Sequence, residues 1–213
     1  MKRIITLLVL LSIPPATGYA ADPLLDQPHW SLELKGGAFQ PALDDWKEHY
    51  GSDKTPHYAG TIAYKLLRQL EVGIEGGYMH KTGKGDGQSS GNLGGKVKYE
   101  LFPIQPFILL RGVFSENQWL VPYVGGGLTK LYYQEKIQYQ DTVRGSVNGY
   151  HGRAGLQLLL DGMDPDAANN LYLDYGVFHT YLFVEAEYIR VMTGTPSIDL
   201  GGKSYLAGFL FEF

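Results

Sequence analysis

The last ten residues of the chain, 204–213, constrain its fold more than any other stretch. Aromatic or small apolar side chains occupy every second position from Tyr205 to Phe213, and smaller or more polar residues lie between them. Successive side chains of a β-strand point to opposite faces of a sheet, so this alternation predicts a strand with one aromatic face. Such a strand belongs either to the core of a soluble sandwich or to a membrane barrel whose aromatic side chains face lipid.

The N-terminal segment indicates export. Lys2 and Arg3 precede an apolar run, and Gly18 and Ala20 place small residues at the −3 and −1 positions of a cleavage site. The run is much shorter than the roughly 20 apolar residues that a membrane-spanning helix needs. We therefore expect residues 1–20 to be a cleaved signal peptide and residues 21–213 to form one exported domain.

Composition limits the class of protein further. The chain has no cysteine, which excludes disulfide bonds and an N-terminal lipid-modified cysteine. Its 28 glycines and 16 tyrosines are many for 213 residues. The formal net charge of −4 becomes −6 when Lys2 and Arg3 leave with the signal peptide, and this mildly acidic charge argues against a nucleic-acid surface. We expect an all-β exported domain without a nucleic-acid partner.

Seven earlier segments alternate in the same way, which brings the predicted number of strands to eight. The segments lie near residues 30–39, 58–66, 70–78, 97–114, 119–133, 150–158 and 181–188. Pro103 and Pro106 interrupt the fourth of them and suggest a bulge or a break, because proline removes a hydrogen-bond donor from the ladder. We expect one long strand with a bulge.

The connections between these segments alternate in length. Four are long: 40–56, 82–92, 134–147 and 193–203. Two others, near Arg68 and Glu116, are tight turns, and this asymmetry between the outer and inner ends is typical of outer-membrane barrels. The third inner connection, 161–176, breaks the rule. In it, Asp164 followed by Pro165 predicts a helix N-cap with proline at the first helical position, and hence a short helix.

The two faces of the predicted strands differ in charge. One face is apolar through mid-strand, and the other carries the charged residues Glu33, Lys35, Glu71, Glu75, Lys96, Lys98, Glu100, Arg153, Glu185 and Glu187. A soluble sandwich would show the same alternation, with its charges outside. The signal peptide, the aromatic last strand and the loop asymmetry favour an antiparallel up-and-down transmembrane β-barrel. Its narrow interior would then hold these charges as mutually paired groups.

Two sequence features resemble a known family. The segment Val121-Pro122-Tyr123-Val124-Gly125-Gly126-Gly127 and the ending with Tyr205, Phe209, Phe211 and Phe213 are similar to small outer-membrane β-barrels of the OmpW-like and OmpA-like kind. The resemblance implies a porin-like monomer among the outer-membrane lipids of a Gram-negative cell envelope. It also implies an assembly machinery that reads the terminal aromatic residues and, for OmpW-like members, an interior that binds or passes small hydrophobic compounds. The helix-bearing connection 161–176 departs from the family pattern.

A second functional class, a lipid-modifying acyl hydrolase or transferase, needs a serine and a histidine near the outer rim. The candidate histidines are His80, His151 and His179, whereas His29 lies near Ser31 at the opposite end of the first strand. Nucleophile, base and orienting group cannot be assembled from these positions, so we predict a structural or binding/permeation barrel with no catalytic residues.

The sequence also predicts no cofactor and no metal. Gly125–Gly127 lies within a strand and not at a strand-to-helix turn, so it is not a phosphate loop. The segment from Lys84 to Gly87 has one carboxylate and lacks the ligand spacing of a calcium site.

Overall fold

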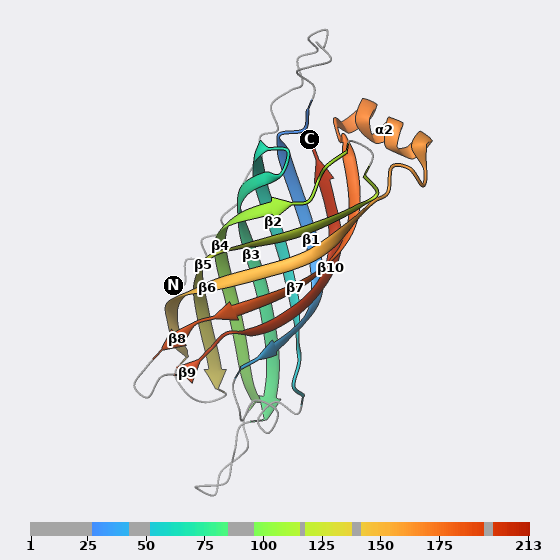
Figure 1. Cartoon of the computed structure of the whole chain (residues 1–213). Coiled ribbons are helices and arrows are strands. Elements are labelled where there is room, and N and C mark those ends of the chain that lie inside the picture. The colour runs from blue at the N-terminus through green and yellow to red at the C-terminus, as the bar shows by residue number, and fades with distance from the viewer. Residues whose placement is uncertain (1–26, 43–51, 85–95, 116–117, 138–141, 194–197) are drawn as a thin grey trace, which may run out of the picture.

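The computed structural model describes residues 27–42, 52–84, 96–115, 118–137, 142–193 and 198–213, so the expected signal peptide lies outside the described residues. Eight antiparallel strands form a closed barrel (Figure 1). They are β1 (Trp30–Pro41), β2 (Thr55–Leu67), β3 (Leu70–Lys84), β4 (Lys96–Arg111), β5 (Leu120–Ile137), β6 (Val143–Leu159), β7 (His179–Arg190) and β10 (Gly202–Glu212). Each strand pairs with its neighbours in the chain, and β10 pairs with both β7 and β1.

The last strand closes the barrel by pairing with the first. Leu34 of β1 pairs with Phe209 of β10, and the carbonyl oxygen of Phe213 accepts hydrogen bonds from the backbone N–H groups of His29 and Trp30 at 2.7 and 3.0 Å. Closure gives every strand two hydrogen-bonded neighbours and leaves no sheet edge.

The two ends of the barrel differ. At the end where β1 begins and β10 finishes, here called the terminal end, helix α2 (Pro165–Tyr175) connects β6 to β7 (Figure 1). At the opposite end, here called the loop end, β8 (Met192–Thr193) and β9 (Ile198–Asp199) form a small hairpin between β7 and β10.

The predicted helix is confirmed together with its cap. The Asp164 side chain accepts a hydrogen bond from the Ala167 N–H at 3.0 Å, and Pro165 begins the helix. Gly176 ends it in the left-handed conformation, at φ 71°, which glycine adopts without strain. None of the helices in the described ranges is long and apolar enough to cross a membrane.

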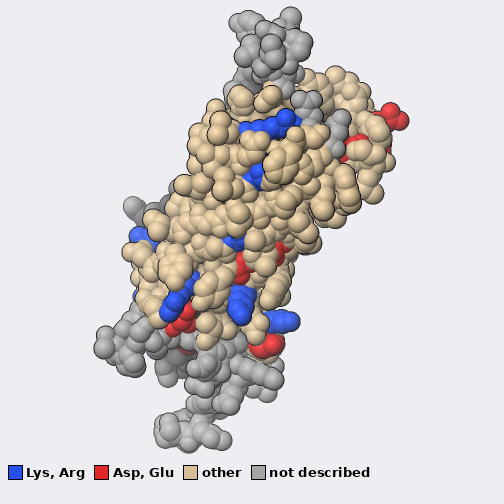
Figure 2. Space-filling model, viewed as in Figure 1, with Lys and Arg blue, Asp and Glu red and all other residues tan. Residues whose placement is uncertain are grey.

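The wall of the barrel is apolar on the outside. Large side chains such as Leu34, Ile74, Ile108, Val124 and Val184 are exposed around it. Figure 2 shows that one face carries few charged side chains over its middle, while lysine, arginine and acidic residues gather mainly toward the end away from α2. An apolar wall of this kind matches the hydrocarbon region of a bilayer.

The prolines of β4 do not produce the bulge that the sequence suggested. The register with β3 is the same on both sides of Pro103, since Gly76 pairs with Ile104 and Met79 with Leu101. Pairing with β3 is interrupted at Pro103, and pairing with β5 is interrupted at Pro106. The expected bulge was wrong. Each proline interrupts the pairing of β4 with one neighbouring strand, while the pairing with the other neighbour continues past it.

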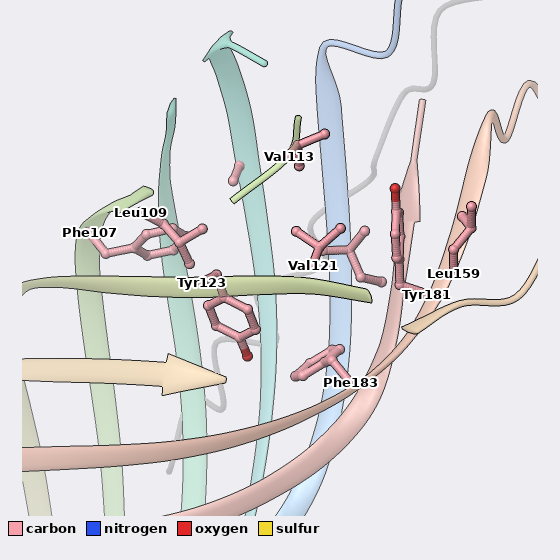
Figure 3. Close-up of a cluster of buried hydrophobic side chains, with 10 residues drawn as sticks. Phe107, Leu109, Val113, Val121, Tyr123, Leu159, Tyr181 and Phe183 are labelled. Carbon is pink, nitrogen blue, oxygen red and sulfur yellow. The ribbon is translucent and has the colours of Figure 1, made fainter. Parts of the chain in front are cut away.

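Apolar side chains fill both ends of the barrel interior. The terminal-end apolar cluster contains Ala63, Phe107, Leu109, Val113, Val121, Tyr123, Leu159, Tyr181, Phe183 and Leu210. Figure 3 shows its labelled side chains projecting from several strands into the space that the barrel encloses. The loop-end apolar cluster contains Phe39, Met79, Tyr99, Leu101, Leu131, Ile189 and Val191. Polar residues occupy the interior between and beside these clusters.

Candidate functional site in the barrel interior

The central polar layer of the interior combines residues from four strands. It contains Glu33 and Lys35 of β1, Glu75 of β3, Arg153 of β6, and Glu185 and Glu187 of β7, all of them buried. Each occupies an inward position of its strand, and the residues on either side of it are apolar or glycine and are exposed or half-buried. Period-two alternation therefore brings six charged groups from distant parts of the chain into one small volume.

Two cations hold most of this layer together. The Nζ of Lys35 lies 2.6 Å from Glu75 Oε2 and 2.6 Å from Glu185 Oε1. The Nη1 of Arg153 lies 2.7 Å from Glu75 Oε2 and 3.6 Å from Glu33 Oε2. These contacts span the barrel interior and replace water as the partners of the buried charges.

Neighbouring aromatic residues complete the packing of the layer. The Tyr123 hydroxyl donates to Glu185 Oε2 at 2.9 Å, and the guanidinium carbon of Arg153 lies 3.8 Å from the centroid of the Phe107 ring. The charged layer is thus packed directly against the terminal-end apolar cluster, and charged and aromatic groups together fill the cross-section.

A second polar layer lies nearer the terminal end. Arg111 Nη1 contacts Glu71 Oε1 at 2.9 Å and also contacts Glu212, while its Nε donates to Gln157 at 2.9 Å. Lys65 contacts Glu212 from β2. Of this layer, the sequence prediction included only Glu71. Arg111 and Glu212 were missed, although both lie on the inward face of an alternating strand.

The structure separates two predicted residues from the interior network. Lys98 and Glu100 pair with each other at 2.8 Å on the outward face of β4, where Glu100 also contacts Lys136 at 3.3 Å and accepts from the Tyr78 hydroxyl at 2.8 Å. Their expected place in the interior was wrong. Tyr99 and Leu101 point inward instead, because the interior at the loop end is apolar and the outward surface there carries charge. The third predicted residue of this stretch, Lys96, lies in β4, and its side chain is outside the described part.

Three histidines make hydrogen bonds that bear on the enzymatic alternative. His57 Nδ1 lies 3.0 Å from Ser204 Oγ, His151 Nδ1 lies 3.0 Å from Thr129 Oγ1, and His179 Nδ1 lies 2.8 Å from Asp161 Oδ2. The first pair could not be read from the sequence, because β2 and β10 come to lie on either side of β1 only when the barrel closes. His57 and Ser204 are both 0% exposed beneath the loop-end apolar cluster, so no lipid reaches them.

Several hollows open on the surface of the described chain, and two of them bear on function. One, of about 390 Å³, opens at the terminal end beside Lys65, Arg111, His179 and Glu212. The other, of about 610 Å³, is a shallow apolar groove on the outer wall across β2 to β5, lined in part by Trp30, Ile62, Ile108 and Gly126.

Comparison with solved structures identifies the fold. Neisserial surface protein A is 11% identical, with a TM-score of 0.57 over 86% of this chain and 97% of that one. The outer membrane protein OprG from Pseudomonas aeruginosa is 14% identical, with a TM-score of 0.60 over 88% of this chain and 97% of that one. No protein family and no curated protein sequence matches the chain. At such identities the likeness shows the fold alone, which is that of the small eight-stranded outer-membrane β-barrels.

Proposed function

We propose that this chain is an outer-membrane barrel that serves as a closed structural scaffold and does not conduct ions. The observation that supports this role is the filled interior. Two apolar clusters enclose a central layer in which Lys35 and Arg153 each bridge buried carboxylates. An eight-stranded barrel is only wide enough for its own side chains, so a filled interior leaves no aqueous path.

Conductance measurements test this proposal. The mature chain, refolded and inserted into planar lipid bilayers, is expected to give no stable current steps, while a large porin inserted under the same conditions gives them. A stable, water-filled conductance that persists at low voltage would contradict the closed interior.

The proposed role includes the partners that the family resemblance implied. The barrel would lie as a monomer among outer-membrane lipids, after an assembly machinery has recognised its aromatic last strand. The exposed apolar wall supports contact with lipid, since side chains such as Leu34, Ile108 and Val184 have no other covering in the chain's described part.

Binding of a small hydrophobic molecule is a second candidate function, and the groove of about 610 Å³ on the outer wall favours it. This groove faces the membrane, from which such a molecule would enter. Trp30 lines it, so a brominated hydrophobic compound should quench the fluorescence of Trp30 in a variant that lacks the other two tryptophans, Trp46 and Trp119. Unchanged fluorescence at saturating compound would contradict binding there.

The lipid-modifying alternative requires an accessible nucleophile beside a histidine. Among the described hydrogen bonds, Ser204 is the serine that bonds to a histidine, His57. Both side chains are fully buried inside the barrel, so this serine is not accessible to a lipid. Incubation of the purified protein with labelled lipopolysaccharide is expected to release no acyl chain, and release above the level of a heat-denatured sample would favour the enzymatic role.

A further inference from the structure

Three buried side chains meet in the interior next to the loop-end apolar cluster. They are His57 of β2, Glu75 of β3 and Glu187 of β7, and one potential ligand atom of each lies within 4.8 Å of the other two. The ring centroid of Phe39, which belongs to that cluster, lies 6.4 Å from that of His57. All three side chains are at most 3% exposed. The group is thus enclosed by protein and has no access to bulk water.

Each of the three side chains has one polar atom held by the protein and another without a partner. His57 Nδ1 contacts Ser204 Oγ at 3.0 Å, Glu75 Oε2 accepts from Thr61 Oγ1 at 3.0 Å, and Glu187 Oε1 accepts from the Gln105 amide at 2.7 Å. The remaining atoms, His57 Nε2, Glu75 Oε1 and Glu187 Oε2, are buried and have no hydrogen-bond partner. Buried polar atoms without partners are costly, so three together mark a place where a bound ligand would satisfy all of them.

The charges of the layer indicate the sign of that ligand. The central polar layer contains four carboxylates, those of Glu33, Glu75, Glu185 and Glu187, but only two cations, Lys35 and Arg153. Glu187 forms none of the described ion pairs, and its one described hydrogen bond is from a neutral amide. In the terminal-end layer, by contrast, two carboxylates meet two cations. Two carboxylates in excess of the cations in a dry interior are neutralised either by protons or by a bound cation, and a divalent cation would balance both of them.

We propose that His57 Nε2, Glu75 Oε1 and Glu187 Oε2 bind one divalent first-row transition-metal ion, with Zn²⁺ as the representative. An imidazole nitrogen with two carboxylate oxygens suits such ions, whereas Ca²⁺ and Mg²⁺ prefer sites made of oxygen alone. Ligand atoms at about 2.0–2.2 Å from Zn²⁺ are roughly 3–4 Å apart, so small side-chain movements close the site. The Oε1 of Gln105, which is also buried without a partner, is available as a fourth ligand.

The surrounding residues are arranged as those of metal sites are. Ser204 and Gln105 fix the orientation of the His57 ring and the Glu187 carboxylate through the atoms that do not face the ion. Bound there, the ion would join β2, β3 and β7 across the interior. The site goes beyond the proposed scaffold role and does not depend on whether the barrel conducts.

The test is metal binding by the full mature chain without an affinity tag. The refolded protein, stripped with chelator and dialysed, is titrated with Zn²⁺ and its metal content is measured. We expect a single Zn²⁺ per chain, and at least about tenfold weaker binding in His57→Gln and Glu187→Gln, which lose a ligand. The matched control is His151→Gln, which alters another buried interior histidine outside this group and should bind like the wild type. Absence of stoichiometric binding by the wild type, or equal binding by His57→Gln, would overturn the site.

X-ray absorption on the wild-type protein provides a second measurement that needs no variant. We expect an edge spectrum with one imidazole and oxygen ligands, and the absence of cysteine from the chain excludes sulfur. A fully hydrated ion, or a site with several imidazoles, would show that the metal binds elsewhere on the protein and would overturn the assignment. Unchanged heat-modifiable migration in gels establishes that each variant has folded.

Discussion

The Nζ of Lys35 lies 2.6 Å from Glu185 Oε1, although 150 residues separate the two in the chain. Lys35 is in β1 and Glu185 in β7, which are not neighbours because β10 lies between them. The contact therefore crosses the interior, and it exists only in the closed barrel. The stability of the folded barrel should depend on such contacts as well as on the backbone ladders.

Replacing Lys35 with methionine should strongly destabilise the barrel. The change removes one cationic partner from both Glu75 and Glu185 and leaves buried carboxylates less compensated, at an expected cost of about 3–5 kcal/mol. Urea unfolding in lipid vesicles measures the free energy. The matched control is Lys98→Met, which removes an exposed cation from the outward face of β4, where Lys136 and Tyr78 still contact Glu100, and should leave the unfolding midpoint nearly unchanged. Equal effects of the two changes would contradict a buried network.

Gly127 is a second position where the structure predicts a large effect. A side chain there would overlap the backbone of β4, with the added Cβ 2.8 Å from Phe107 Cα and in closer contact with the Pro106 carbonyl oxygen. Gly127→Ala should therefore lower the unfolding free energy by about 3 kcal/mol or more, or prevent folding. Gly76→Ala is the control, because a Cβ at that position meets no atom within 4 Å and should change stability by less than about 0.5 kcal/mol. A harmless Gly127→Ala would show that β4 and β5 are further apart.

Deletion of Phe213 should reduce the amount of barrel in the outer membrane. Its backbone forms three hydrogen bonds with His29 and Trp30 at the seam, and its side chain belongs to the proposed assembly signal with Tyr205, Phe209 and Phe211. Comparing the deletion with Phe213→Ala, which keeps the backbone, separates the two contributions in an outer-membrane yield assay. If recognition depends on the side chain, both variants lose yield. If closure depends on the backbone, only the deletion lowers the yield. A wild-type yield from both variants would count against both roles.

Much of the fold follows from the sequence, since strand alternation is a local property. The alternation of Tyr205–Phe213 predicted the strand, and β10 does close against β1. The lipid-facing side of that strand followed only when the signal peptide and the loop asymmetry were considered with it. The Asp164-Pro165 pair likewise predicted the helix in the inner connection, because capping involves only residues adjacent in the chain. Where apolar and charged positions were assigned to faces by residue type alone, as at Lys98 and Glu100, the prediction was wrong.

Only the tertiary structure decided which interior residues meet. The sequence placed Glu33, Lys35, Glu75 and Glu185 on one face of their strands but did not give their partners, and it gave no indication that His57 lies beside Glu75 and Glu187. The physical reason is that contacts across a barrel depend on the register of every strand pair and on closure of the sheet. Local alternation determines whether a side chain points into or out of the barrel. Which side chains it then meets across the interior depends on the register of all eight strand pairs together.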